Sequence, residues 1–183
     1  SYSDRYPKEE AYFTPGDIRR EDLTQQERQV VADYDNATRY NDQVVDAILA
    51  RFTDRDAIAV YLSDHGEEVY DYRDFFCRSH DLPLTPEVCK YQFEIPFMIW
   101  MSDTYRRNRP DVAAQVAGAL DRPFSADDLS HLLLDLAGIR CRWYDPARSL
   151  IGERFDTTRP RPLLMGFEPA GNYETIIGRD RKQ

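Results

Sequence analysis

The feature that most constrains the fold is a short apolar run that stops abruptly at polar residues. Residues 57–62 read AIAVYL, and Ser63, Asp64, His65 and Gly66 follow at once. A short apolar run with polar borders is typical of a central β-strand. In open α/β sheets, ligands bind beyond the carboxyl ends of the strands. Asp64 and His65 are therefore candidate site residues.

Helix and strand patterns alternate along the rest of the chain. Thr24 and Glu27 predict a capping box, and apolar residues at helical spacing predict a long helix over residues 24–52. The order of elements predicts an α/β fold with three layers, α/β/α. The other predicted elements are a loop over 1–22, an irregular segment over 70–92 with one helical turn, a strand over 97–101, helices over 103–120 (broken at Pro110) and 125–137 (capped by Ser125 and ended by Gly138), and short strands within 161–167 and 173–178.

The composition argues against a nucleic-acid-binding surface and against a membrane-spanning helix within these 183 residues. A chain of 183 residues suits one domain, and 24 basic against 33 acidic residues lack the local surplus that a nucleic-acid groove needs. No apolar run reaches the roughly 18 residues of a membrane-spanning helix. We expect a soluble chain that binds no nucleic acid. Because it begins with Ser1 and not with methionine, we expect a piece of a longer protein.

Asp64 and His65 offer one oxygen and one imidazole nitrogen, a donor pair that suits Zn²⁺. Two adjacent ligands leave at least two positions to be filled from elsewhere, and a bare Asp-His dipeptide is common. His80 could contact a phosphate or donate a proton, or it could be a surface histidine. We interpret His131 as a core or surface residue. Glu67 and Glu68 lie next to the pair, and we expect them to be solvated acids and not ligands.

The three cysteines leave two readings open. Cys77 and Cys89 bracket the loop that contains His80, and a disulfide between them would staple that loop in an oxidising compartment. With Cys141, they could equally be three unrelated thiols.

Five blocks of sequence resemble the periplasmic catalytic domain of bacterial phosphoethanolamine transferases, within the alkaline phosphatase and sulfatase superfamily. They follow one another in the order of that family and cover nearly all of residues 2–145. The blocks are RYPKEEAYFTP (5–15), YDNATRYNDQVVDAIL (34–49), YLSDHGEE (61–68), IPFMIWMSDTY (95–105) and DDLSHLLLDLAGI (127–139).

The resemblance implies a sulfatase-like α/β domain behind a membrane anchor, with zinc held by a glutamate, a nucleophilic threonine and a consecutive Asp-His. Asp64 and His65 match that Asp-His, and His80 matches a histidine that contacts phosphoethanolamine. The glutamate and the threonine should lie upstream of Ser1. We therefore expect a single partial domain over 1–183, with a family-variable tail over 146–183, and no activity from this chain alone.

The function implied is transfer of phosphoethanolamine from phosphatidylethanolamine to lipid A, a core sugar or a glucan, at the periplasmic face of the bacterial inner membrane. A periplasmic location also implies a disulfide between Cys77 and Cys89. The alternatives are a sulfatase or phosphodiesterase of the same superfamily, which transfers to water, and a noncatalytic domain that keeps the fold. Apolar faces that would meet the rest of the domain should be exposed.

Overall fold

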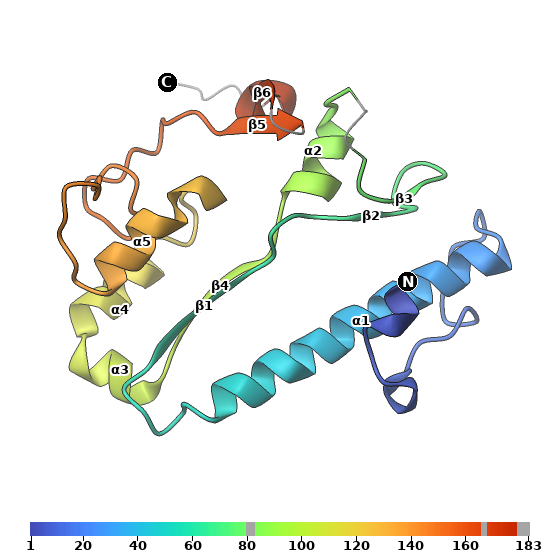
Figure 1. Ribbon diagram of the computed structural model, residues 1–183, viewed down its shortest axis with the longest axis horizontal. Coiled ribbons are helices and arrows are strands. Elements are labelled where there is room, and N and C mark those ends of the chain that lie inside the picture. Colours follow the sequence, from blue (N-terminus) through green and yellow to red (C-terminus); the bar gives the residue numbers. More distant parts are fainter. Residues whose placement is uncertain (80–82, 166–167, 179–183) are drawn as a thin grey trace.

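The computed structural model describes residues 1–79, 83–165 and 168–178. Helices and short strands are interspersed along the chain, with β1 to β3 in succession and then α2 before β4. Figure 1 shows α1 on one side, the β1–β4 ribbon across the middle, and α3 to α5 on the other side. The helices are α1 (Gln25–Ala50), α2 (Pro86–Phe93), α3 (Asp103–Asn108), α4 (Pro110–Ala117), α5 (Leu129–Leu136) and α6 (Tyr173–Ile176), and the 3-10 turns are η1 (Tyr2–Asp4), η2 (Lys8–Glu10) and η3 (Ala126–Asp128). The strands are β1 (Ile58–Leu62), β2 (Glu68–Val69), β3 (Phe76–Cys77), β4 (Phe97–Met101), β5 (Pro162–Met165) and β6 (Glu168–Asn172).

The long helix α1 begins with the predicted capping box. The Glu27 amide donates to the Thr24 hydroxyl at 3.3 Å, and the Glu27 carboxylate accepts from the Thr24 amide at 2.6 Å. Buried Asn36 in the same helix accepts from the main-chain amides of Tyr12 and Phe13, each at 2.8 Å. These bonds hold the N-terminal segment against α1. The segment also contains the 3-10 turns η1 and η2, so it is more regular than the loop that the sequence predicts.

The two central strands pair with each other, and they run antiparallel. The register places Ile58 opposite Met101 and Leu62 opposite Phe97. The other strands form two small antiparallel sheets, β2 with β3 and β5 with β6. Because β1 and β4 run in opposite directions, the end of β1 that leads to the Asp-His pair lies beside the start of β4.

The helical segment after β4 breaks where the sequence predicts, because α3 ends just before Pro110 and α4 begins at it. Gly138 ends the next helical segment with a φ of +67°, which suits glycine. The predicted cap by Ser125 is wrong: its hydroxyl donates to Asp127 at 3.4 Å, and the chain enters α5 through η3. Leu132 of α5 centres the main apolar cluster, against which Phe97 and other partly buried side chains pack.

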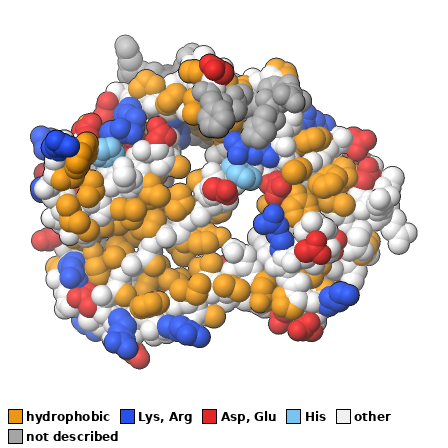
Figure 2. Space-filling model, viewed as in Figure 1, with side chains coloured by type: hydrophobic (Ala, Val, Ile, Leu, Met, Phe, Trp, Pro, Cys, Tyr) orange, Lys and Arg blue, Asp and Glu red, His pale blue; other side chains and the backbone are white. Residues whose placement is uncertain are grey.

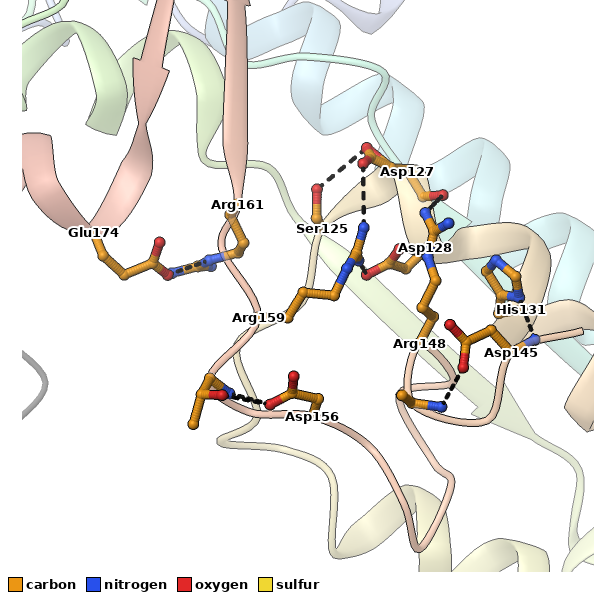
Figure 3. A network of polar contacts seen from close by, with 12 residues as sticks. Ser125, Asp127, Asp128, His131, Asp145, Arg148, Asp156, Arg159, Arg161 and Glu174 are labelled. Atoms are coloured by element: carbon orange, nitrogen blue, oxygen red, sulfur yellow. Dashed lines mark hydrogen bonds and ion pairs between the residues drawn. The ribbon is translucent and has the colours of Figure 1, made fainter. Parts of the chain in front are cut away.

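A polar network ties residues 145–161 to the start of α5 (Figure 3). Asp128 is almost fully buried and accepts from Arg148 Nε at 2.6 Å and from Arg159. His131, also buried, accepts at Nδ1 from the Asp145 amide at 3.0 Å. His131 is thus a structural residue, as its position in the leucine-rich helix predicts.

The tail places a helix where a strand was expected. Residues 162–165 form β5 as predicted, but its partner is β6, and α6 begins at Tyr173, within the expected strand 173–178. The Asn172 side chain accepts from the Glu174 amide at 3.0 Å and caps this helix. The cap favours a helical turn over residues 173–176, where the sequence predicts a strand. The boundary between 1–145 and a variable tail stays a prediction.

The three cysteines are free thiols, so the suggested disulfide between Cys77 and Cys89 is not formed. Cys89 is fully buried on α2 and packs with Leu163 and Tyr173, whereas Cys77 is exposed in β3. The two thiols lie in different surroundings, because Cys89 packs against the C-terminal tail and not against the loop that contains Cys77.

Apolar side chains are exposed on several elements, as expected of a chain that resembles part of a domain. Ile48 is 52% exposed, Leu120 84% and Trp143 69%. In Figure 2, hydrophobic side chains gather over the region of β4, α4 and α5. In the described part of the chain, α1 is the one long helix, and neither it nor any other is apolar enough to cross a bilayer.

Candidate metal centre

The Asp-His pair lies in a tight turn that its own polar groups hold. The Ser63 hydroxyl donates to the His65 carbonyl oxygen at 2.7 Å, and Asp64 Oδ1 accepts from the His65 amide at 3.0 Å. Such local side-chain bonds replace the ladder that the strand would otherwise continue. The turn therefore begins directly after β1 ends.

Gly66 fits this turn because the C-terminal end of α2 lies against it. The Gly66 amide donates to the Gln92 carbonyl oxygen at 3.1 Å. A Cβ at position 66 would lie 2.9 Å from the carbonyl oxygen of Glu94, and closer still to that of Tyr91. Main-chain atoms cannot rotate away as a side chain can, so the close approach requires glycine.

The donor atoms of the pair face each other. His65 Nδ1 lies 2.8 Å from the Gly66 carbonyl oxygen, and since a carbonyl only accepts, Nδ1 carries the proton. The lone pair is then on Nε2, which lies 3.7 Å from Asp64 Oδ2. The Asp64 side chain is 87% exposed and the His65 side chain 34%. Both donors are accessible to an ion.

The spacing fits two ligands of one zinc ion. Tetrahedral zinc with bonds of about 2.0–2.2 Å places neighbouring donor atoms about 3.3 Å apart. The observed 3.7 Å between Asp64 Oδ2 and His65 Nε2 needs only a small side-chain rotation. The hydrogen bond at Nδ1 is the outer-shell contact that orients metal-binding histidines. When the His65 ring is protonated, its charge holds the pKa of the Asp64 carboxyl below its usual value, and main-chain amides that donate to Asp64 act in the same direction.

The pair supplies only part of a coordination sphere. Within residues 1–79, 83–165 and 168–178, no group of three or more His, Cys, Asp or Glu side chains is arranged to hold a metal. His80, the third candidate site residue, lies outside the described residues, and its role stays a prediction. Ser79, directly before it, is described, and its amide donates to Gln92 Oε1 at 3.3 Å.

A buried polar network beside the turn was missed by sequence reasoning. Glu68, expected to be solvated, is fully buried, and its carboxylate pairs with Arg73 through two hydrogen bonds of 2.6 and 2.7 Å. Gln92 is 1% exposed and donates to the same carboxylate at 2.9 Å. Glu68 and Arg73 lie in one hairpin, but Gln92 comes from α2, 24 residues beyond Glu68, so the network as a whole is not visible in the local sequence.

The Asp-His pair opens onto a cavity of about 780 Å³. Its polar wall contains Arg78, whose positive charge suits an anionic ligand, and Arg161, whose guanidinium pairs with Glu174 at 2.7 Å. Its apolar wall comes from β4, α4 and the residues that follow. The site residues on the cavity wall are Asp64, His65, Arg78, Gln92, Glu94 and Tyr173. The arrangement can hold a divalent ion beside a phosphate-sized group.

Known proteins resemble this chain in sequence and in fold. The Sulfatase family matches residues 1–139. The chain is 36% identical over 170 residues to phosphoethanolamine transferase EptC of Escherichia coli O18:K1:H7, covering 86% of the chain and 27% of that protein. It is 32% identical over 114 residues to the Kdo(2)-lipid A phosphoethanolamine 7''-transferase of Escherichia coli K12, covering 62% of the chain and 19% of that protein. The chain therefore spans about a quarter of the length of the first of these relatives.

Solved structures agree. The crystal structure of the C-terminal periplasmic domain of EcEptC from Escherichia coli superposes with a TM-score of 0.81 at 31% identity, covering 98% of this chain and 50% of that one. A structure of the same domain in complex with zinc matches equally well. The fold is thus the predicted α/β fold, part of an alkaline phosphatase-like domain. The chain belongs to the sulfatase family, and within that family it is similar to the C-terminal periplasmic domain of the phosphoethanolamine transferases.

Proposed function

We propose that the protein containing this chain is a zinc-dependent phosphoethanolamine transferase at the periplasmic face of the bacterial inner membrane. It moves phosphoethanolamine from phosphatidylethanolamine to a hydroxyl of a cell-envelope lipid or glycan. The observation that supports this most directly is the 3.7 Å separation of Asp64 Oδ2 and His65 Nε2 on the wall of a large cavity. The names of the relatives and the zinc complex of the EcEptC domain support the same reading.

Each residue has a distinct part in this proposal. Asp64 and His65 hold the ion through one carboxylate oxygen and one imidazole nitrogen. Zinc, when bound, supplies a Lewis acid that lowers the pKa of a hydroxyl nucleophile and offsets charge on the phosphoryl oxygens. Arg78 on the same cavity wall attracts the phosphate. His80 contacts the phosphoryl oxygens or gives a proton to the leaving group.

A second candidate is a hydrolase of the same superfamily, in which water takes the place of the acceptor hydroxyl. The match of residues 1–139 to the Sulfatase family supports it. The Asp-His pair serves both reactions equally, because it binds the ion and not the acceptor. The two are separated by the product: a modified envelope molecule for a transferase, or free phosphoethanolamine or sulfate for a hydrolase.

The experiment is a transfer assay on the full-length protein in membranes that contain phosphatidylethanolamine labelled in its head group. We expect the label in lipid A, core sugar or glucan fractions, and its loss in Asp64→Ala and His65→Ala. Asp46→Ala, an equal change at an exposed position of α1, is the matched control and should keep full transfer. Label released only as free phosphoethanolamine would favour the hydrolase, and transfer unaffected by both site variants would refute the metal assignment.

A further inference from the structure

We propose that Gln92 is a positioning residue, which holds the Asp64–His65 turn and the residues just before and at Ser79 in one fixed arrangement. Gln92 lies on α2 and is 1% exposed. Its main-chain oxygen accepts from the Gly66 amide at 3.1 Å, and its side-chain Oε1 accepts from the Ser79 amide at 3.3 Å. One residue thus contacts two segments, each next in sequence to a candidate site residue.

The side chain at position 92 must both donate and accept. Its Nε2 donates to Glu68 Oε2 at 2.9 Å, while Oε1 accepts from Ser79. A carboxylate could not donate, and an apolar side chain could do neither. Because an unsatisfied buried polar group costs about 1–3 kcal/mol, both contacts favour this one rotamer of the amide.

Arg73 fixes the orientation of the network. Its guanidinium holds both oxygens of the buried Glu68 carboxylate, which leaves Oε2 aimed at the Gln92 amide. A two-point pair of this kind sets the plane of the carboxylate as well as its position. The direction of the Gln92 amide, and with it the position of Ser79, therefore follows from a buried ion pair.

Glu68 tethers the turn a second time. It lies two residues beyond Gly66, so residues 64–68 are joined to α2 through the main chain at Gly66 and through the side chain at Glu68. The donor atoms of Asp64 and His65 lie at the start of this short segment. Loss of the Gln92 contacts should loosen the turn and spread the two donor atoms over more positions, which weakens binding of an ion that needs both.

The test compares Gln92→Met with Gln115→Met, the same change at an exposed position of α4. Methionine keeps the volume of glutamine and removes both side-chain hydrogen bonds, to Glu68 and from Ser79, while the main-chain bond from the Gly66 amide stays. The first readout is amide hydrogen exchange of residues 64–66 and 78–79 in the full-length protein without metal. We expect at least tenfold faster exchange in Gln92→Met, at unchanged exchange in α1, and no change in Gln115→Met. Unchanged exchange at the turn would overturn the proposal.

The second readout is the zinc dissociation constant, measured by competition with a chelator; this consequence depends on the proposed function. Loss of a group bonded directly to a metal ligand typically costs 10–100-fold in metal affinity. The Gln92 side chain acts on Asp64 and His65 only through the turn, so we expect a smaller loss for Gln92→Met, of about three- to tenfold. A purely structural role would lower the melting temperature and leave the zinc affinity of the folded protein unchanged, and that result would also overturn the proposal.

Failure of the variant to fold and failure of the unaltered protein to bind zinc can each be told apart from failure of the proposal. If Gln92→Met does not fold, Glu68→Gln takes its place, since it keeps the shape of the network while weakening its hydrogen bonds, and the same criteria apply. If the unaltered protein binds no zinc, the proposed function fails, whereas hydrogen exchange still decides whether Gln92 holds the turn.

Discussion

Gly66 lies against the main-chain carbonyl oxygen of Tyr91 so closely that no Cβ fits between them. We predict that Gly66→Ala forces the turn away from α2 and lowers the free energy of unfolding by about 1–3 kcal/mol, the usual cost of overpacking. Denaturant titration of the purified protein measures this. Gly16→Ala is the control, because its Cβ would meet only ordinary contacts, and equal stability of the two variants would contradict the close approach.

The buried ion pair of Glu68 and Arg73 can be tested with a single variant and a double variant. Arg73→Met leaves a fully buried carboxylate with the Gln92 hydrogen bond but without its oppositely charged partner, which should cost about 3–5 kcal/mol of unfolding free energy. The double variant Arg73→Met with Glu68→Met removes the charge as well and should recover most of that loss. Additive losses in thermal or denaturant unfolding would show that the pair does not act as one unit.

Asp128 holds two arginines from the segment that follows α5. We predict that Asp128→Asn, which removes the charge but keeps the shape, lowers the free energy of unfolding by about 2 kcal/mol, because charge-assisted hydrogen bonds to Arg148 and Arg159 are lost. Asp127→Asn is the matched control, since that side chain is 46% exposed. A larger loss at residue 127 than at residue 128 would contradict the network in Figure 3.

The thiols should differ in reactivity. Burial, and to a lesser extent the Glu94 charge, raise the pKa of the Cys89 thiol, so it loses its proton less readily than an exposed thiol does. The folded state then binds the proton more tightly than the unfolded state, and stability should fall as the pH rises above about 8.5. Thiol titration under native conditions should find Cys77 and Cys141 reactive and Cys89 protected.

Under nonreducing denaturation, all three thiols should react. Only one reactive thiol there would mean a disulfide between two of the three cysteines, and would contradict the free thiols of the structure.

Elements with a local cause could be predicted from the sequence, and elements set by distant contacts could not. The capping box at Thr24, the break at Pro110 and the strand over residues 97–101 each depend on neighbouring residues, and each is present. The strand expected over 173–178 failed because the cap at Asn172 competes with it. Burial of Glu68 could not be foreseen, since its partner Gln92 comes from a helix late in an irregular segment.

The sequence predicts a site at Asp64 and His65 because they follow the carboxyl end of a strand in an α/β sheet, and the structure supports only part of that reasoning. The pair does follow the carboxyl end of β1, but β1 pairs antiparallel with β4, so no edge of parallel strands is present in the part of the chain described. What places the pair is the turn at Ser63 and the close packing of Gly66 on α2. The sequence therefore identifies the two candidate ligands, whereas their relative position depends on packing against α2.

The most direct test of the account is a zinc-edge anomalous diffraction map from crystals of the full-length protein, or of its whole periplasmic domain, grown with zinc. The account predicts one strong peak about 2.0–2.2 Å from both Asp64 Oδ2 and His65 Nε2, and no peak there in Asp64→Ala. A strong peak elsewhere, with these two side chains turned away from the ion, would contradict it.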